Sequence, residues 1–409
     1  MQQKYRRLKL ACYTTNVTMA VVANMPPVLF LTFRNLYGIS YSLLGLLILI
    51  GFVTQLGIDL IFSFFSHKFN IPLTVKLTPL IAAIGLLIYA AAPIIFPHSV
   101  YAGLVIGTFI FSFSSGLAEV LISPVIAAIP AKDPDREMSK LHSVYAWGVV
   151  PVIVLSTLFI LIFGSKNWQV LSVFFSIIPF LGFLLFSKTE IPEMETPKKV
   201  SSAIGLLKNK TLLLCVMGIF FGGAAECTMA QWSSSYIEKA LNIPKVWGDL
   251  FGVALFGVML GLGRTLYAKK GKNITKVMLL GSVGATVCYA TAALVGIPII
   301  GLIACAFTGI CTSMLWPGSL VAASDRFPKG GVFVFALMAA GGDLGASVGP
   351  QLVGIVTDTV LKSQNAINIA TGLGINAEQL GMKAGMLVGM LFPLMAIFVF
   401  SYLHRKKAN

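Results

Sequence analysis

Four carboxylates stand out in this sequence because each lies inside a long apolar stretch: Asp59, Glu119, Glu226 and Asp343. A charge at the centre of a lipid bilayer costs about 2.5–3.5 kcal/mol on insertion scales, so acids in such stretches face a partner or a water-filled cavity. Desolvation also penalises the ionised form of a carboxyl group and so favours proton binding. We therefore predict that these four acids bind and release protons, with Glu119 the leading candidate.

Three of these acids also have an alternative role. Glu119 could remain protonated and bond a neighbouring helix, and Asp343, in AAGGDLGASVGP, could bond nearby backbone instead of facing a cavity. Asp59 could line a pathway or pair with a cation. The cation Arg264, in GVMLGLGRTLY, lies toward one end of its apolar run. It could extend to the membrane surface or form a salt bridge at a gate.

Polar and aromatic side chains surround Glu226 in the segment GGAAECTMAQWSSSYIEKA. Amide and carboxylate groups bond hydroxyls, and an aromatic face packs on the C–H face of a sugar ring. Asn24 lies in another apolar stretch, where its amide needs a partner. We therefore predict a solute-binding set composed of Asn24, Glu119, Glu226, Gln231, Trp232 and Trp316.

The composition indicates which solvent surrounds these residues. Of the 409 residues, 57% are hydrophobic and only 11% are charged, whereas soluble domains carry about 25% charged residues. The surface must therefore face lipid. The net charge of +15 comes from Lys and Arg in short gaps between apolar runs, which excludes nucleic acid as a partner. The six cysteines show neither disulfide nor metal spacing, so we expect no metal and no cofactor.

Twelve apolar runs are long enough to cross a bilayer as helices. They are too long and too evenly apolar for barrel strands, so we predict an all-α membrane protein of two related six-helix bundles. Asn16, Asn24, Pro26 and Pro27 make the first run a polar, broken helix. The predicted spans are about 10–34, 42–65, 75–95, 101–129, 141–163, 168–186, 212–237, 248–267, 277–295, 299–324, 332–357 and 382–403.

The positions of Lys and Arg predict the orientation of these spans. With the N-terminus inside, 24 of the 30 cations lie inside, as the positive-inside rule requires. The outside cations are Arg34, Lys166, Lys239, Lys245, Lys362 and Lys383. We therefore expect a multi-pass protein of the inner or plasma membrane, with both termini cytoplasmic. The N-terminal segment MQQKYRRLKL leads into a run too long for a signal-peptide core, which predicts an uncleaved first helix.

The chain divides into two halves at a polar segment. Residues 187–211 contain five lysines and two prolines, so we predict a cytoplasmic linker between six-helix bundles at 1–186 and 212–409. Gly116 and Pro124 recur as Gly309 and Pro317, with the same spacing, 193 positions later. Such internal repeats are common in transporters. The outside segment 361–381 could be a short lid or a loop.

The sequence resembles the major facilitator superfamily over essentially its whole length, and within it the branch of fucose/glucose/galactose–proton symporters. The segment GLAEVLISPVIAAIP is similar to the Gly-rich fourth helix of that branch, as are LHSVYAWG, GRTLY, TSMLWPGSLVAAS and GGDLGASVGPQLVG. The resemblance implies that Glu119 is the proton-coupling or sugar-binding carboxylate. In VVANMPPVLF, Asn24 stands where these relatives carry an acid, and SHKFNIP is a degraded form of the superfamily's Gly-x-x-x-Asp-Arg signature.

These features together predict a secondary transporter that works by alternating access and is not an enzyme. The leading hypothesis is symport of a monosaccharide or similar small polar solute with a proton, or alternatively with sodium, by a monomer in the lipid bilayer. The alternative is a proton-coupled exporter or antiporter of amphipathic organic compounds. No Walker-type phosphate loop occurs in the sequence, so ATP does not drive transport within this chain.

Overall fold

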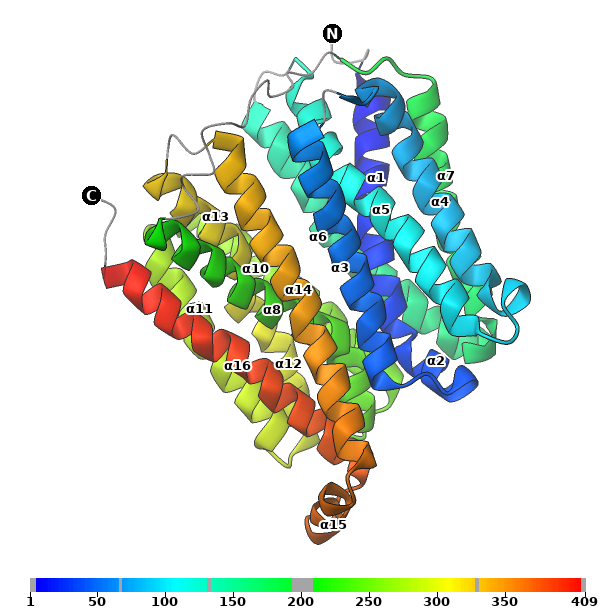
Figure 1. The fold of residues 1–409 in the computed structure, drawn as a ribbon, viewed down its shortest axis with the longest axis vertical. Helices are drawn as coiled ribbons and strands as arrows, with labels where there is room; N and C mark the ends of the chain where they lie inside the picture. The colour runs from blue at the N-terminus through cyan, green and yellow to red at the C-terminus, as the bar shows by residue number, and fades with distance from the viewer. Residues whose placement is uncertain (1–4, 66–67, 131–133, 193–208, 328–330, 406–409) are drawn as a thin grey trace. The chain divides into compact units, whose positions relative to one another are not determined.

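The computed structural model describes residues 5–65, 68–130, 134–192, 209–327 and 331–405. These residues form helices without any strand (Figure 1). The helices are α1 (Arg6–Val28), α2 (Phe30–Tyr37), α3 (Tyr41–Phe65), α4 (Ile71–Ile95), α5 (Val100–Ala127), α6 (Pro134–Phe163), η2 (Ser165–Asn167), α7 (Trp168–Ser187), α8 (Lys210–Lys239), α9 (Lys245–Gly248), η4 (Asp249–Ala254), α10 (Leu255–Lys270), α11 (Ile274–Leu294), α12 (Pro298–Thr312), α13 (Leu315–Arg326), α14 (Gly331–Lys362), α15 (Gln364–Gly372) and α16 (Ala377–Arg405).

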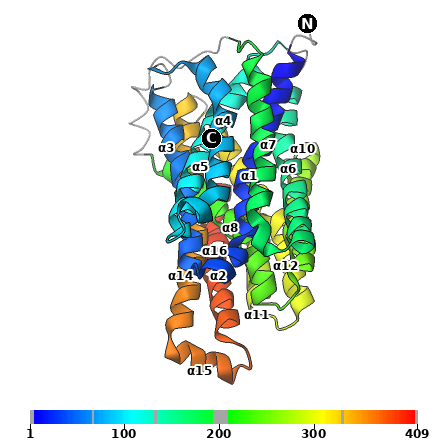
Figure 2. The same ribbon diagram turned by 90° about the vertical axis from the view of Figure 1, so that its right-hand side faces the viewer.

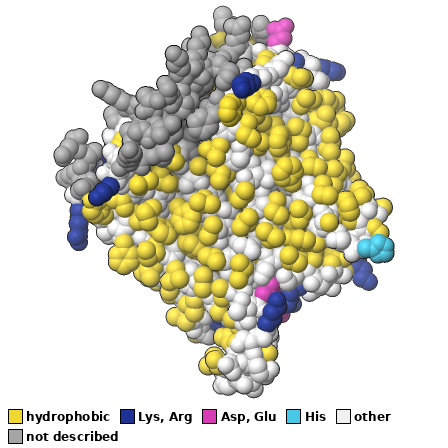
Figure 3. All heavy atoms as spheres, in the orientation of Figure 1, with side chains coloured by type: hydrophobic (Ala, Val, Ile, Leu, Met, Phe, Trp, Pro, Cys, Tyr) yellow, Lys and Arg dark blue, Asp and Glu magenta, His cyan; other side chains and the backbone are white. Residues whose placement is uncertain are grey.

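The structure confirms the prediction of an all-α membrane protein. Within the described residues, 11 helical stretches are long and apolar enough to cross a membrane. The pair α1 and α2, bent by 45°, brings the number to 12 when it is counted as one span. Hydrophobic side chains cover most of the described surface visible in Figure 3, as a lipid-facing exterior requires.

The described chain forms two compact units. The first contains Met1–Thr32 and Val53–Val200, and the second contains Phe33–Phe52 and Ser201–Asn409. Helix α3 is therefore divided, because its first part packs in the second unit and its remainder in the first. Most of the predicted linker, residues 193–208, lies outside the described residues. The bundle boundaries at 186 and 212 stay a prediction.

The bend in the first span follows from its two prolines. Pro26 and Pro27 lack the N–H groups that would continue the helical hydrogen bonds, and α1 ends at Val28. The Asn24 amide donates to the Ala20 carbonyl of its own helix at 2.9 Å. This local bond gives the half-buried amide a partner within the helix. The prediction of a broken first span is confirmed.

Two segments differ in detail from the expected spans. The run 299–324 has a short break between α12 and α13, close to Pro317, whose missing N–H removes one helical hydrogen bond there. The segment 361–381, predicted to lie outside as a lid or a loop, is mostly helical, because α15 begins at the cap Ser363, whose hydroxyl accepts the Ala366 N–H. Figure 2 shows α15 joining the ends of α14 and α16. This short helix was not predicted from the polar, uncharged sequence of the segment.

Glycines allow α8 and α14 to pack closely in the second unit (Figure 1). A Cβ added at Gly345 would collide with the backbone oxygen of Phe220, and one at Gly341 would lie 2.7 Å from the Val216 side chain. Small residues permit such close approach of membrane helices. Any larger side chain at Gly345 must push the two helices apart.

An ion pair joins α1 to α6 near the N-terminal ends of both helices. Lys9 Nζ lies 2.8 Å from Glu137, and Lys140 Nζ lies 2.9 Å from the same carboxylate. Glu137 precedes the apolar part of its helix, which begins at Ser143. The hydrogen bonds from Lys9 and Lys140 lower the pKa of Glu137 to about 2.

We expect Glu137→Gln to lower the melting temperature slightly. Because the pKa of Glu137 is depressed, its stabilising contribution is complete above the ordinary carboxyl range and is lost only as the pH falls toward 2. Solvent-accessible ion pairs contribute about 0.2–1 kcal/mol. Thermal unfolding at pH 5 and pH 8 should therefore show the same small difference between the variant and the wild type. A difference that disappears at pH 5 would contradict this assignment.

Candidate functional site

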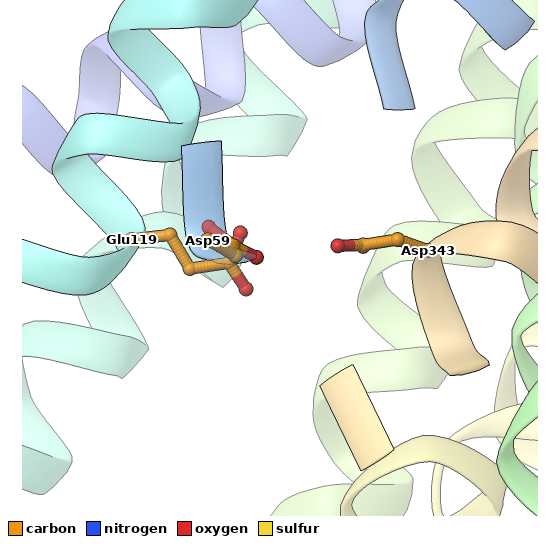
Figure 4. Close-up of side chains that lie close together, drawn as sticks. All are labelled: Asp59, Glu119 and Asp343. Atoms are coloured by element: carbon orange, nitrogen blue, oxygen red, sulfur yellow. The ribbon is translucent and has the colours of Figure 1, made fainter. Parts of the chain in front are cut away.

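Asp59 on α3 and Glu119 on α5 form a carboxylate pair in the first unit. Their carboxylate oxygens lie within 4.8 Å of each other, and Figure 4 shows both side chains directed into the same space. Gly116, one turn before Glu119, brings the two helices together. A Cβ at that position would lie 3.1 Å from Cα of Gln55. Neighbouring helices thus hold the two acids side by side.

The environment of this pair favours cation binding. Asp59 is buried, whereas the side chain of Glu119 is exposed although it lies in the apolar helix α5. Two ionised carboxylates at this separation repel each other by about 3 kcal/mol at an effective dielectric constant of about 20. A proton or a sodium ion removes that repulsion. The pair can therefore accept a cation through the exposed member, Glu119.

A salt bridge in the second unit joins Glu226 on α8 to Arg264 on α10. An amino nitrogen of Arg264 lies 3.0 Å from Oε1 of Glu226, and the side chains are 35% and 14% exposed, respectively. Glu226 lies near the middle of α8. Of the two alternatives for Arg264, the structure thus shows a salt bridge, made at the middle of a membrane span.

The break before α13 helps to hold Arg264. Pro317 has no N–H, so the carbonyl four residues earlier, that of Ser313, receives no helical hydrogen bond from it. The Arg264 Nε group donates to this carbonyl at 3.2 Å. The proline that interrupts the helix therefore supplies an acceptor that orients the guanidinium toward Glu226.

Trp316 lies against two glycines of neighbouring helices. A Cβ at Gly223 of α8 would lie 2.9 Å from the Trp316 ring, and one at Gly342 of α14 would lie 2.6 Å from it. Trp316 itself is only partly buried. Gly223 precedes Glu226 by three residues and therefore shares its face of α8. The aromatic ring and the charged pair thus belong to one region of the second unit.

The other predicted site residues are placed differently. Asp343 follows Gly342 on α14 and is buried, with its side chain extending from the helix (Figure 4). Gln231 is buried too. Trp232 is fully buried, donates through Nε1 to the Pro350 carbonyl at 2.8 Å and packs on the Tyr41 ring. Contact between Trp232 and a solute would require this packing to open.

Charged residues at the start of α3 form a further cluster in the second unit. Glu378 accepts hydrogen bonds from Nε of Arg34 at 3.1 Å and from the Tyr41 hydroxyl at 2.8 Å. Asp358 accepts the backbone N–H groups of Tyr41 and Ser42. It therefore caps α3 from another helix. From the sequence, Arg34 is expected only as an outside cation, and no local pattern predicts this cluster.

The apolar helices described above, with charged groups in the middle of their spans, are those of a multi-pass membrane protein. The family model of the Major Facilitator Superfamily matches residues 11–350. The chain therefore belongs to the major facilitator superfamily, whose members carry small-molecule solutes, often with protons. The resemblance stated from the sequence is confirmed. No curated protein matches the sequence significantly.

Solved structures of the same fold include transporters with different solutes. A bacterial homologue of the human lysosomal transporter Spinster superposes with a TM-score of 0.79 at 13% identity, covering 99% of this chain and 97% of its own. The D-xylose–proton symporter superposes with a TM-score of 0.74 at 15% identity, covering 95% of this chain and 97% of its own. The Escherichia coli fucose–proton symporter superposes with a TM-score of 0.63 at 16% identity, covering 98% of this chain and 99% of its own. At these identities the comparisons show the fold alone.

Proposed function

We propose that this protein is a proton-coupled symporter of a monosaccharide or similar small polar solute, working by alternating access. The observation that carries the proposal is the Asp59–Glu119 pair, with carboxylate oxygens within 4.8 Å of each other and one exposed member. The pair gives the chain a place to bind one proton. Glu226 and Asp343 would complete the set of acids that respond to it.

Coupling requires the proton and the solute to favour each other's binding. A bound proton removes the repulsion between Asp59 and Glu119 and makes one oxygen a hydrogen-bond donor. A polyhydroxy solute can accept from that group and donate to the remaining carboxylate. Asn24, Gln231, Trp232 and Trp316 are the further residues that we assign to solute binding. That fucose–proton and xylose–proton symporters share this fold supports the choice of a sugar and a proton as the transported pair.

The remaining features of the proposal come from the sequence. The placement of 24 of the 30 cations on one side supports an inner or plasma membrane protein with both termini in the cytoplasm. We propose that it acts as a monomer with bundles at 1–186 and 212–409. Each bundle would contribute one part of the solute pathway.

Solute-induced proton movement tests the proposal. The purified chain is reconstituted in weakly buffered vesicles without a gradient, and D-glucose, D-galactose, L-fucose and D-xylose are added in turn while the external pH is recorded. A symported sugar is expected to make the external solution more alkaline. A sugar that moves without any pH change would contradict proton coupling. External acidification that accompanies sugar entry would indicate proton antiport instead.

A further inference from the structure

The Glu226–Arg264 pair has hydrogen-bonding capacity that its own contacts do not use. Oε1 of Glu226 bonds Arg264, whereas Oε2 is buried and has no hydrogen-bond partner within the described residues. A buried acceptor left unsatisfied costs free energy, and a carboxylate oxygen costs more than a neutral one. Oε2 of Glu226 therefore requires a donor that the described protein does not supply.

Arg264 offers the complementary groups. Its hydrogen bonds to Glu226 and to the Ser313 carbonyl use only part of the guanidinium donor set. The side chain is 35% exposed, so the guanidinium is accessible to a solute. A ligand beside the pair can therefore donate a hydrogen bond to Glu226 and accept one from Arg264. The two groups are adjacent, because a hydrogen bond joins them.

The charge of the ligand follows from the cost of breaking the pair. An anion would compete with Glu226 for Arg264, and a cation would compete with Arg264 for Glu226. Either exchange leaves a charge of the protein without its partner at membrane depth, where charges are expensive. An uncharged ligand with adjacent hydroxyls can donate to Oε2 of Glu226 and accept from Arg264 while the pair remains intact. The geometry therefore favours a neutral vicinal diol.

Trp316 supplies the apolar side of the same site. Gly223 and Gly342 leave room for its ring, and the residue remains partly exposed. Aromatic rings pack well on the C–H face of a sugar ring. A charged pair that can bond hydroxyl groups, together with an aromatic surface in the same region, suits a ligand with one polar edge and one apolar face.

We infer that Glu226 and Arg264 together bind two adjacent hydroxyls of an uncharged sugar or polyol, with Trp316 packed on its C–H face. The inference rests on the proposed function, which it extends by making Arg264 a specificity-determining residue and by excluding charged sugars. Pro317 has a positioning role, because it leaves the Ser313 carbonyl to orient Arg264.

Ligand binding to the full-length purified chain tests the inference without any gradient. Thermal shift and isothermal titration are measured with the four neutral sugars named above, with D-glucuronate and D-glucosamine as charged analogues, and with single-deoxy derivatives of the sugar that binds. We expect a neutral sugar to bind more tightly than its charged analogues. Arg264→Gln should weaken it about tenfold or more, as expected for the loss of a hydrogen bond to a charged group.

The deoxy derivatives distinguish contact from a structural role. Removing the hydroxyl that Arg264 bonds should weaken binding to the wild type but cause no further loss in Arg264→Gln, since the two changes remove one interaction. Arg405→Gln, at the exposed end of α16, is the matched control and should bind normally. If Arg264→Gln does not fold, the double variant Glu226→Gln/Arg264→Gln, which buries no lone charge, is measured in its place.

The outcomes separate this inference from the proposed function. Equal binding of a neutral sugar by the wild type and Arg264→Gln would overturn the inference, as would tighter binding of glucuronate or glucosamine than of glucose. Absence of any response to neutral sugars would overturn it as well. Binding that depends on Arg264 but produces no proton movement in vesicles would support the inference and refute proton coupling.

Discussion

Glu119→Gln is expected to abolish solute accumulation driven by a proton gradient while leaving exchange of solute across the membrane intact. The exposed Glu119 and the buried Asp59 share a bound proton in the proposed mechanism, and an amide cannot release one. A gradient of one pH unit is worth about 1.4 kcal/mol per proton, or about tenfold accumulation. In the variant the solute should reach only equal concentrations on the two sides of the membrane. Uptake and counterflow of labelled sugar in the same vesicles measure both quantities.

Two further variants make the interpretation specific. Glu190→Gln changes an exposed acid beyond the end of α7 and should leave accumulation at the wild-type level. Asp59→Asn should reduce accumulation, and the double variant should add little to the loss, because the two acids act as one proton site. Undiminished gradient-driven uptake by Glu119→Gln would refute the assignment of Glu119 to coupling.

Gly345→Ala should cause the largest loss of stability among single-methyl changes in the second unit. The added Cβ would collide with the Phe220 backbone oxygen, which belongs to a helix and is not able to rotate away. Overpacking of this kind costs about 1–3 kcal/mol. Because α8 carries Glu226 and α14 carries Asp343, we also expect weaker solute binding. Thermal unfolding and titration of the variant measure the two effects.

Gly261→Ala is the matched control for this change. Gly261 lies within α10, and a Cβ there meets no atom within 4 Å. Alanine is also the better helix former, so the control should be as stable as the wild type or slightly more stable. A Gly345→Ala protein with unchanged melting temperature would show that α8 and α14 can separate at little cost, contrary to the packing argument.

The sequence predicted the parts of the fold that depend on local composition. Apolar run length identified the membrane spans, and Pro26 and Pro27 correctly indicated a broken first span. The short helix α15 was missed as such, because its 9 residues make only about two and a half turns, too few for a helical period to stand out in the sequence. Local signals therefore determined the spans but not the structure of the connection between α14 and α16.

The candidate site was predicted less completely, for a physical reason. Rarity alone drew attention to Asp59, Glu119 and Glu226, because charges in apolar runs are costly wherever they point. Which groups meet depends on the rotation and bending of helices distant in the sequence. The contact of Arg264 with Glu226 and the burial of Trp232 against the Pro350 carbonyl are both of this kind. Only the proline at 317 carried a local signal for the acceptor that orients Arg264.

Because α3 is divided between the two units, we expect that neither half of the chain is stable when it is produced alone. A polypeptide cut within residues 193–208 would separate Tyr41 and Ser42 from Asp358, and Arg34 from Glu378. The N-terminal fragment would then present uncapped backbone donors and an unpaired guanidinium, and the C-terminal fragment two orphan carboxylates. Each fragment produced alone should be prone to degradation, whereas co-production should restore both. Residues 33–52 would thus serve as an assembly signal within one chain.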